Sequence, residues 1–135
     1  MNLTKSFPRS PKTKMCGLVM LPRVIDKARA FHNKLLGDYI FPCPLDKIIL
    51  NFLNTSHNEI VRLANQMTDE EMTLWTNKCC SKKTLKDKER VNQKILERKP
   101  DSQEGLARFI FLRDSISKNR SEITTWVDLI ELDEN

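Results

Sequence analysis

Signals that begin helices recur along this chain, and they limit its possible folds more than any other feature. In a capping box, a short polar residue and an acidic residue three positions later satisfy the first free backbone N–H groups of a helix. The pairs Ser56–Glu59, Thr68–Glu71 and Asp101–Glu104 have this spacing, each ahead of a stripe of apolar residues. Because the 135 residues include only three glycines and few β-formers, the sequence favours short helices over a sheet.

Apolar residues spaced three and four apart, together with proline and glycine, set the expected helix limits. Pro22 suits the first position of a helix, and Gly37 suits its left-handed end. The first two expected helices cover about 22–36 and 44–53. Three more begin at Ser56, Thr68 and Asp101, and Ser121 caps the last one.

The flanking segments complete this prediction. Pro8 and Pro11 bias their preceding residues away from helix, so residues 1–21 should form an ordered, partly extended arm. Residues 82–99 permit a helix but carry few apolar side chains, so we expect them at the periphery. The helix beginning at Asp101 should turn five apolar side chains inward: Leu106, Phe109, Ile110, Leu112 and Ile116. We therefore predict an all-α, single compact domain of six or seven short helices, with a helical body at 22–135.

Composition excludes several classes of protein. No apolar run approaches the roughly 20 residues of a membrane-spanning helix, and no secretory signal opens the chain. The four cysteines match neither a disulfide framework nor a metal site, which favours reduced thiols in the cytoplasm. Two histidines without clustered ligands predict no metal site, and no motif identifies a cofactor.

Charge is distributed unevenly along the chain, although the net charge is only +5. Residues 1–34 carry eight lysines and arginines against one acid, Asp26, whereas residues 121–135 carry five acids and no base. Opposite charges attract, so we expect the two ends to lie side by side.

A second basic segment, residues 82–99, has eight bases and three acids and remains free for an acidic partner. The sequence contains no known DNA-recognition helix motif and no aromatic RNA-binding motif. Nucleic acid is therefore the least favoured partner, and any such binding should weaken steeply with salt.

Residues 7–46 hold the best candidates for a site. On a helical wheel, Arg23 and Lys27 form a basic ridge, and Arg29 borders the apolar face, where it needs a carboxylate such as Asp26 or Asp46. These charges can form a structural ion-pair network, or a pocket whose guanidinium groups grip an anion. The candidate ligand-binding residues are Arg9, Arg23, Asp26, Lys27, Arg29, Tyr39 and Asp46.

Cys43 is a weak candidate for a catalytic nucleophile. It precedes Pro44 at an expected helix start, where the positive end of the helix should lower the pKa of the thiol. The sequence places neither His32 nor His57 to act as its base, and lone cysteines are commonly small buried apolar residues. Whether the protein is an enzyme stays open.

Several of these segments also resemble a known family. The chain is similar to bacterial proteins of the domain-of-unknown-function family 5069, over most of its length except about 78–105. The resemblance rests on four main motifs: Pro8-Arg9-Ser10-Pro11, Leu21-Pro22-Arg23 with Asp26-Lys27-Ala28-Arg29-Ala30, Cys43-Pro44-Leu45-Asp46, and Thr68-Asp69 with Glu71 and Trp75. It implies one compact domain and no particular activity.

Two hypotheses about function follow. The leading one is that the protein binds an anionic small molecule between the arm, the first helix and the turn at Tyr39–Asp46. The alternative is a non-enzymatic module for protein–protein interaction or self-association. Self-association would make the protein a homo-oligomer.

Overall fold

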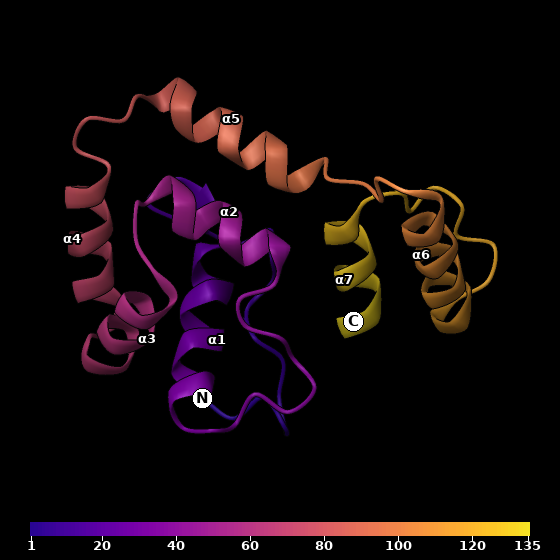
Figure 1. Cartoon of the computed structure of the whole chain (residues 1–135), viewed down its shortest axis with the longest axis horizontal. Coiled ribbons are helices and arrows are strands. Elements are labelled where there is room, and N and C mark those ends of the chain that lie inside the picture. Colours follow the sequence, from indigo (N-terminus) through magenta and orange to yellow (C-terminus); the bar gives the residue numbers. More distant parts are fainter.

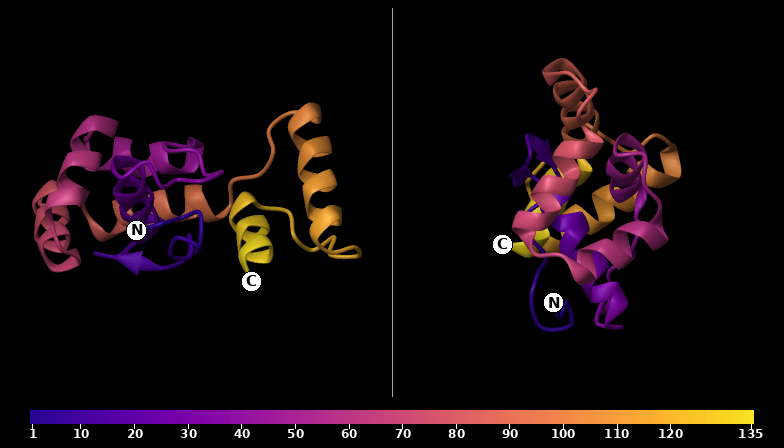
Figure 2. Two further views of the ribbon diagram at one scale, coloured as in Figure 1. Left: turned by 90° about the horizontal axis from the view of Figure 1, so that it is seen from below. Right: turned by 90° about the vertical axis from the view of Figure 1, so that its left-hand side faces the viewer.

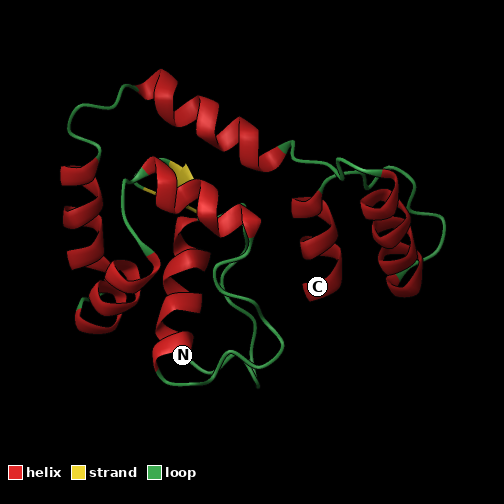
Figure 3. Ribbon diagram, viewed as in Figure 1, coloured by secondary structure: helices red, strands yellow, loops and turns green.

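In the computed structural model, which describes residues 1–135, seven short helices follow a small β-hairpin (Figure 1, Figure 3). The strands β1 (Lys14–Met15) and β2 (Leu18–Val19) pair antiparallel. The helices are α1 (Leu21–His32), α2 (Pro44–Phe52), α3 (His57–Gln66), α4 (Asp69–Cys79), α5 (Leu85–Leu96), α6 (Gln103–Ile116) and α7 (Trp126–Glu134). The predicted fold class, a mostly helical single domain, is confirmed. No helix combines the length and the apolar character needed to cross a bilayer.

Helix α1 is the centre of the molecule. Every residue from Leu21 to Ala28 is buried, and the helix packs against α3, α2 and the hairpin. Its apolar side chains, such as Val24 and Ile25, join a core of 21 buried residues. Because this helix is covered on all sides at its start, its three charged residues there are buried with it.

The capping boxes begin helices where the sequence predicted them in two of three cases. Ser56 and Thr68 accept hydrogen bonds from the third residue of α3 and α4, as expected. The third prediction was one residue early, because Ser102 rather than Asp101 caps α6. The last helix starts at Trp126 and is capped by Thr125 rather than Ser121. Thr125 is the better cap because it has an acid three residues later, where a helix favours negative charge.

The end of α1 differs from the prediction. The helix ends at His32, and Lys34 rather than Gly37 adopts the left-handed conformation that follows it. The backbone N–H of Leu35 donates to the carbonyl of Ala30 at 2.8 Å and closes the helix. The N–H of Leu3 donates to the carbonyl of Leu35, also at 2.8 Å, and ties the arm to the segment that follows. Gly37 has a positive φ in the following turn, where a Cβ would lie 3.2 Å from the carbonyl oxygen of Leu3.

Helix α5 is not peripheral, contrary to the prediction. It crosses one side of the body against β2 and α2, and its residues Val91 and Ile95 are buried (Figure 1). The side chain of Asn92 accepts from the N–H of Val19 at 3.0 Å and donates to the carbonyl of Gly17 at 2.8 Å. A few well-placed contacts therefore tie this polar helix to the hairpin.

Helix α6 stands away from the body and packs mainly on α7 (Figure 2). Together they enclose a small second core of Phe109, Ile123 and Leu129. Of the five side chains expected to point inward, only Phe109 is buried and Leu112 is half-buried, whereas Leu106, Ile110 and Ile116 are exposed. The prediction was wrong because one neighbouring helix can cover only a narrow stripe of α6.

The basic start and the acidic end of the chain lie side by side, which confirms the prediction from charge. The ammonium group of Lys12 lies 2.8 Å from the carboxylate of Asp128, and the hydroxyl of Ser10 donates to Glu131. Both acids belong to α7, so the acidic face of the last helix is turned toward the arm.

Candidate functional site

The structure divides the seven candidate residues between two places. Arg9, Asp26 and Arg29 meet Asp69 in one group, which we call the Asp69 cluster. Arg23, Lys27 and Tyr39 instead line an open hollow, and Asp46 lies behind Lys27. The early cationic residues therefore do not act as one set.

The Asp69 cluster closes on itself. Asp26 accepts from the backbone N–H, Nε and Nη2 of Arg9 at 2.8, 3.1 and 3.0 Å, and Arg9 Nη1 lies 2.8 Å from Asp69. The guanidinium of Arg29 lies 3.0 Å from the carboxylate of Asp69 and donates to the carbonyls of Ala64 and Met67. This is the structural network that the sequence left open, and it ties the arm to α1, α3 and α4.

Asp69 is a member of this cluster that sequence analysis did not include among the candidates. Its partial burial opposes ionisation, but the hydrogen bonds and charges of Arg9 and then Arg29 outweigh burial and lower the pKa of the carboxyl. The only sequence signal was its place at a helix start, where an acid is already favourable without an arginine partner.

Lys27 and Asp46 form a buried ion pair. The ammonium nitrogen lies 2.6 Å from Asp46 Oδ2, and the two side chains are 3% and 0% exposed. The same oxygen accepts from the backbone N–H of Cys43 at 2.9 Å and so completes the capping box of α2. Asp46 therefore has a position that α2 fixes independently of the lysine.

Arg23 holds the carboxylate of Glu134, the last residue of α7. Nη1 and Nη2 donate to the two carboxylate oxygens at 2.8 and 2.7 Å, and the hydroxyl of Tyr39 donates to one of them at 3.0 Å. We call these three side chains the Glu134 clamp. The guanidinium also lies over the Tyr39 ring, 5.5 Å from its centroid. Sequence analysis missed Glu134, although the charge asymmetry indicated the end of the chain that carries it.

The hollow beside this clamp has a volume of 1180 Å³. Its walls come from the arm, the start of α1, the turn after Gly37, and the facing parts of α6 and α7. The charged lining residues are four bases and three acids: Lys5, Arg23, Lys27, Arg108, Asp38, Asp133 and Glu134. Leu3, Phe7, Met20, Ile40 and Ile130 supply apolar walls. The hollow therefore combines apolar walls with charged groups of both signs.

Cys43 lines the same hollow but does not have the expected thiolate character. Burial raises the pKa of its thiol, and the Asp46 carboxylate raises it further, against a smaller opposing effect from Lys27. The predicted lowering by the helix start is therefore wrong. No histidine lines the hollow, so the geometry supplies no histidine base for this residue.

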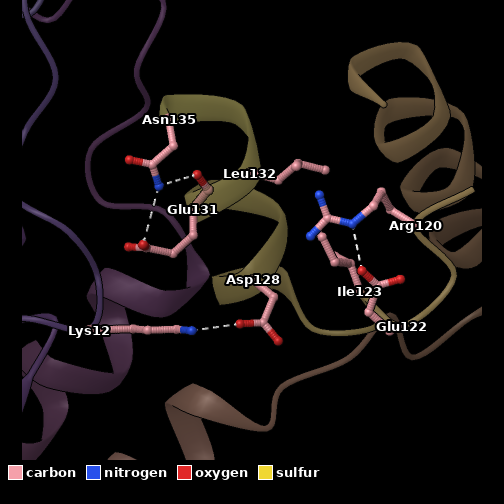
Figure 4. A pocket seen from close by; sticks show the side chains of 8 residues that line it. All are labelled: Lys12, Arg120, Glu122, Ile123, Asp128, Glu131, Leu132 and Asn135. Atoms are coloured by element: carbon pink, nitrogen blue, oxygen red, sulfur yellow. Dashed lines mark hydrogen bonds and ion pairs between the residues drawn. The ribbon is translucent and has the colours of Figure 1, made fainter. Parts of the chain in front are cut away.

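A second, smaller hollow lies along the acidic face of α7 (Figure 4). Its volume is 520 Å³. Four of its five charged side chains form two ion pairs, and the fifth, Glu131, accepts from the hydroxyl of Ser10. Lys12 reaches Asp128 at 2.8 Å, and Arg120 reaches Glu122 at 2.5 Å. With these charges satisfied, we assign this hollow no ligand.

The basic segment 82–99 forms a separate surface on α5. Lys83, Arg90 and Lys94 line a groove of 440 Å³ between α5 and α2 without forming an ion pair. Lys88 has a structural use, because its ammonium donates to the carbonyl of Cys16 at 2.8 Å. Binding of an acidic partner to this segment stays a prediction.

We expect Lys27→Met to lower the free energy of unfolding by about 3–5 kcal/mol at neutral pH, because it leaves Asp46 as an unpaired buried charge. Chemical denaturation followed by circular dichroism measures this loss. Lys47→Met is the matched control, since Lys47 is exposed on α2 and its loss should change stability by less than about 0.5 kcal/mol. Equal effects of both variants would contradict the buried pair.

Tyr39 provides a spectroscopic test of the clamp because it is the only tyrosine. Burial, then the negative charge of Glu134 and its hydrogen bond, raise the pKa of Tyr39 from 10.0 to about 12. The protonated phenol therefore stabilises the fold fully below pH 10, and this contribution is lost as the pH rises from 10 toward 12.

In an ultraviolet titration of phenolate absorbance, Glu134→Gln should move the midpoint of Tyr39 down toward its ordinary value. Asp133→Asn, which changes a neighbouring acid of the hollow, should leave the midpoint in place. Circular dichroism in parallel shows that each chain stays folded. A wild-type midpoint at the ordinary value would place the phenol outside the clamp.

Comparison with known proteins agrees with the resemblance seen in the sequence. No curated protein matches the chain. The family model described as a domain of unknown function (DUF5069) matches residues 5–135, which is nearly the whole chain. The chain therefore belongs to the DUF5069 family.

Proposed function

We propose that this protein binds an anionic small molecule in the hollow between the arm, α1, the turn at 37–43 and α7. The observation that carries the proposal is the presence of two buried cations, Arg23 and Lys27, in the lining of an open hollow. Buried cations beside a concave, partly apolar surface are the usual means of orienting an acidic ligand.

The walls favour an organic ligand over an inorganic ion. Phe7 is 59% exposed and Ile40 is 71% exposed, and both line the hollow. Large apolar side chains exposed around a concavity are typical of ligand-binding grooves. A ligand with an apolar portion would cover them.

The charged side chains that line the hollow favour a ligand with one negative charge. Lys5 and Arg108 line the hollow without an acidic partner and can attract an anion from solution. Asp38 and Asp133 lie in the same lining, so the four bases are nearly balanced by three acids. A molecule with several phosphate groups would meet these acids unfavourably.

A binding screen tests the proposal directly. Organic monoanions, including aliphatic and aromatic carboxylates, sulfonates and phosphate monoesters, are titrated into the protein by calorimetry. For a compound that binds, the double variant Lys5→Ala/Arg108→Ala should weaken affinity about tenfold, since each exposed charge contributes up to about 1 kcal/mol.

Arg62→Ala is the matched control, because Arg62 is exposed on α3 and does not line the hollow. It should bind each compound as the wild type does. The proposal fails if no organic anion binds, or if the control loses as much affinity as the double variant.

Self-association is a second candidate function, favoured by the exposed apolar face of α6. Leu106 and Phe111 are 49% and 71% exposed on a helix whose main packing partner is α7. Light scattering should show a mass above 15.8 kDa as the concentration rises. Leu106→Glu/Phe111→Glu should restore the monomer, whereas Leu74→Glu, an equally exposed site on α4, should not. A monomeric wild type at all concentrations rejects this candidate.

A further inference from the structure

The Glu134 clamp already contains a bound carboxylate, supplied by the chain itself. We infer that Arg23 and Tyr39 form a carboxylate subsite of the hollow, which Glu134 occupies in the absence of ligand and which a ligand carboxylate enters by displacing the end of α7. This inference rests on the proposed function and names its ligand class, an organic monocarboxylate.

The donors of the clamp match a carboxylate in number and direction. Arg23 donates through both terminal nitrogens, at 2.8 and 2.7 Å, and Tyr39 adds a third hydrogen bond at 3.0 Å. The two-pronged guanidinium is suited to a planar carboxylate, and charge-assisted bonds of this length are strong. Arg23 is 3% exposed in the first turn of α1, and its Nη1 also donates to the carbonyl of Arg9 at 3.3 Å, so a contact besides the carboxylate helps to hold it.

The acceptor, in contrast, lies on a weakly held part of the molecule. Helix α7 is anchored in the main core by Trp126, Val127 and Ile130, and Glu134 lies one turn beyond Ile130. On the side of the arm and α1, the helix makes its contacts through acidic side chains. A helix turn with few buried apolar contacts opens at lower cost than the core-facing part of the same helix.

The two buried cations of the hollow therefore differ in how easily their partners exchange. Asp46, the partner of Lys27, is fully buried and is held a second time by the N–H of Cys43. The carboxylate of Glu134 caps no helix and is held by the side chains of Arg23 and Tyr39. Only Arg23 can release its carboxylate without dismantling a helix cap.

The clamp also leaves one donor unused. The Nε–H of Arg23 is buried and has no acceptor while Glu134 binds the two terminal nitrogens. A buried donor without a partner is costly. A small ligand, free of the constraint of α7, can bind side-on and use Nε together with one terminal nitrogen.

Removal of the internal carboxylate tests the subsite. In Glu134→Ala the buried Arg23 loses its partner, so the melting temperature should fall, and acetate or propionate should restore most of the loss in a saturable manner. Sodium chloride at equal ionic strength should not restore it. Benzoate, measured by calorimetry, should bind this variant about tenfold more tightly than the wild type, because its competitor is gone.

Two controls keep the result specific. Asp133→Ala removes the neighbouring acid of the same hollow and should gain no affinity for acetate or benzoate. If Glu134→Ala does not fold, Glu134→Gln keeps one acceptor for Arg23 and should show the same gain in benzoate affinity. Inorganic phosphate is titrated in parallel, and rescue by phosphate but not by acetate would overturn the carboxylate assignment.

Displacement of α7 is tested in the wild type. Amide hydrogen exchange at 126–134 should accelerate in saturating benzoate, while exchange in α3 stays unchanged. Unchanged exchange in α7 would overturn the displacement. If another organic anion binds tightly to the hollow but Glu134→Ala gains no affinity for benzoate, this inference is overturned and the proposed function still stands. Absence of any anion binding would reject both.

Discussion

The buried ion pair between Lys27 and Asp46 is the constraint on which the candidate site depends. Removal of two charges from water costs several kcal/mol each, so such a pair persists only where the geometry fixes both partners. Asp46 meets this condition because it also caps α2 through the N–H of Cys43. The pair thereby joins the start of α2 to the middle of α1, and the turn between Gly37 and Cys43 becomes one wall of the hollow. An apolar pair could give similar stability but would not fix this position.

How much of the fold the sequence predicts depends on the distance between the interacting residues. The starts of α3 and α4 were predicted correctly because Ser56 and Thr68 act on residues three positions away. The end of α1 was not, because Lys34 takes the left-handed position expected of Gly37, and Gly37 instead lies against Leu3 of the arm, a residue distant in the sequence. The burial of α6 was also predicted wrongly for a non-local reason. Helical periodicity shows which side chains can be buried, but not whether another element covers them.

The candidate site follows the same rule. Arg23, Lys27 and Tyr39 could be grouped from sequence because they lie within one short segment around α1. Their acidic partner Glu134 is 111 residues from Arg23, and the charge asymmetry located only the end of the chain. For Cys43, the expected helix-start effect was real in direction but smaller than the effect of burial, and only coordinates show burial.

The structural and functional interpretations of the early basic residues therefore apply to different members of the set. A pair whose acid is anchored independently, like Asp46, is part of the fold. In the second pair the acid, Glu134, is held by the side chains of Arg23 and Tyr39 and by no helix cap, and it is this pair that we propose as an occupied carboxylate subsite. If Arg23 is a carboxylate subsite, docking of α7 and binding of a ligand carboxylate compete for one guanidinium, and linkage makes each weaken the other by the same factor. The stability of α7 on the body would then set the affinity of the hollow, and changes at the acidic face of α7 would tune binding without touching the ligand.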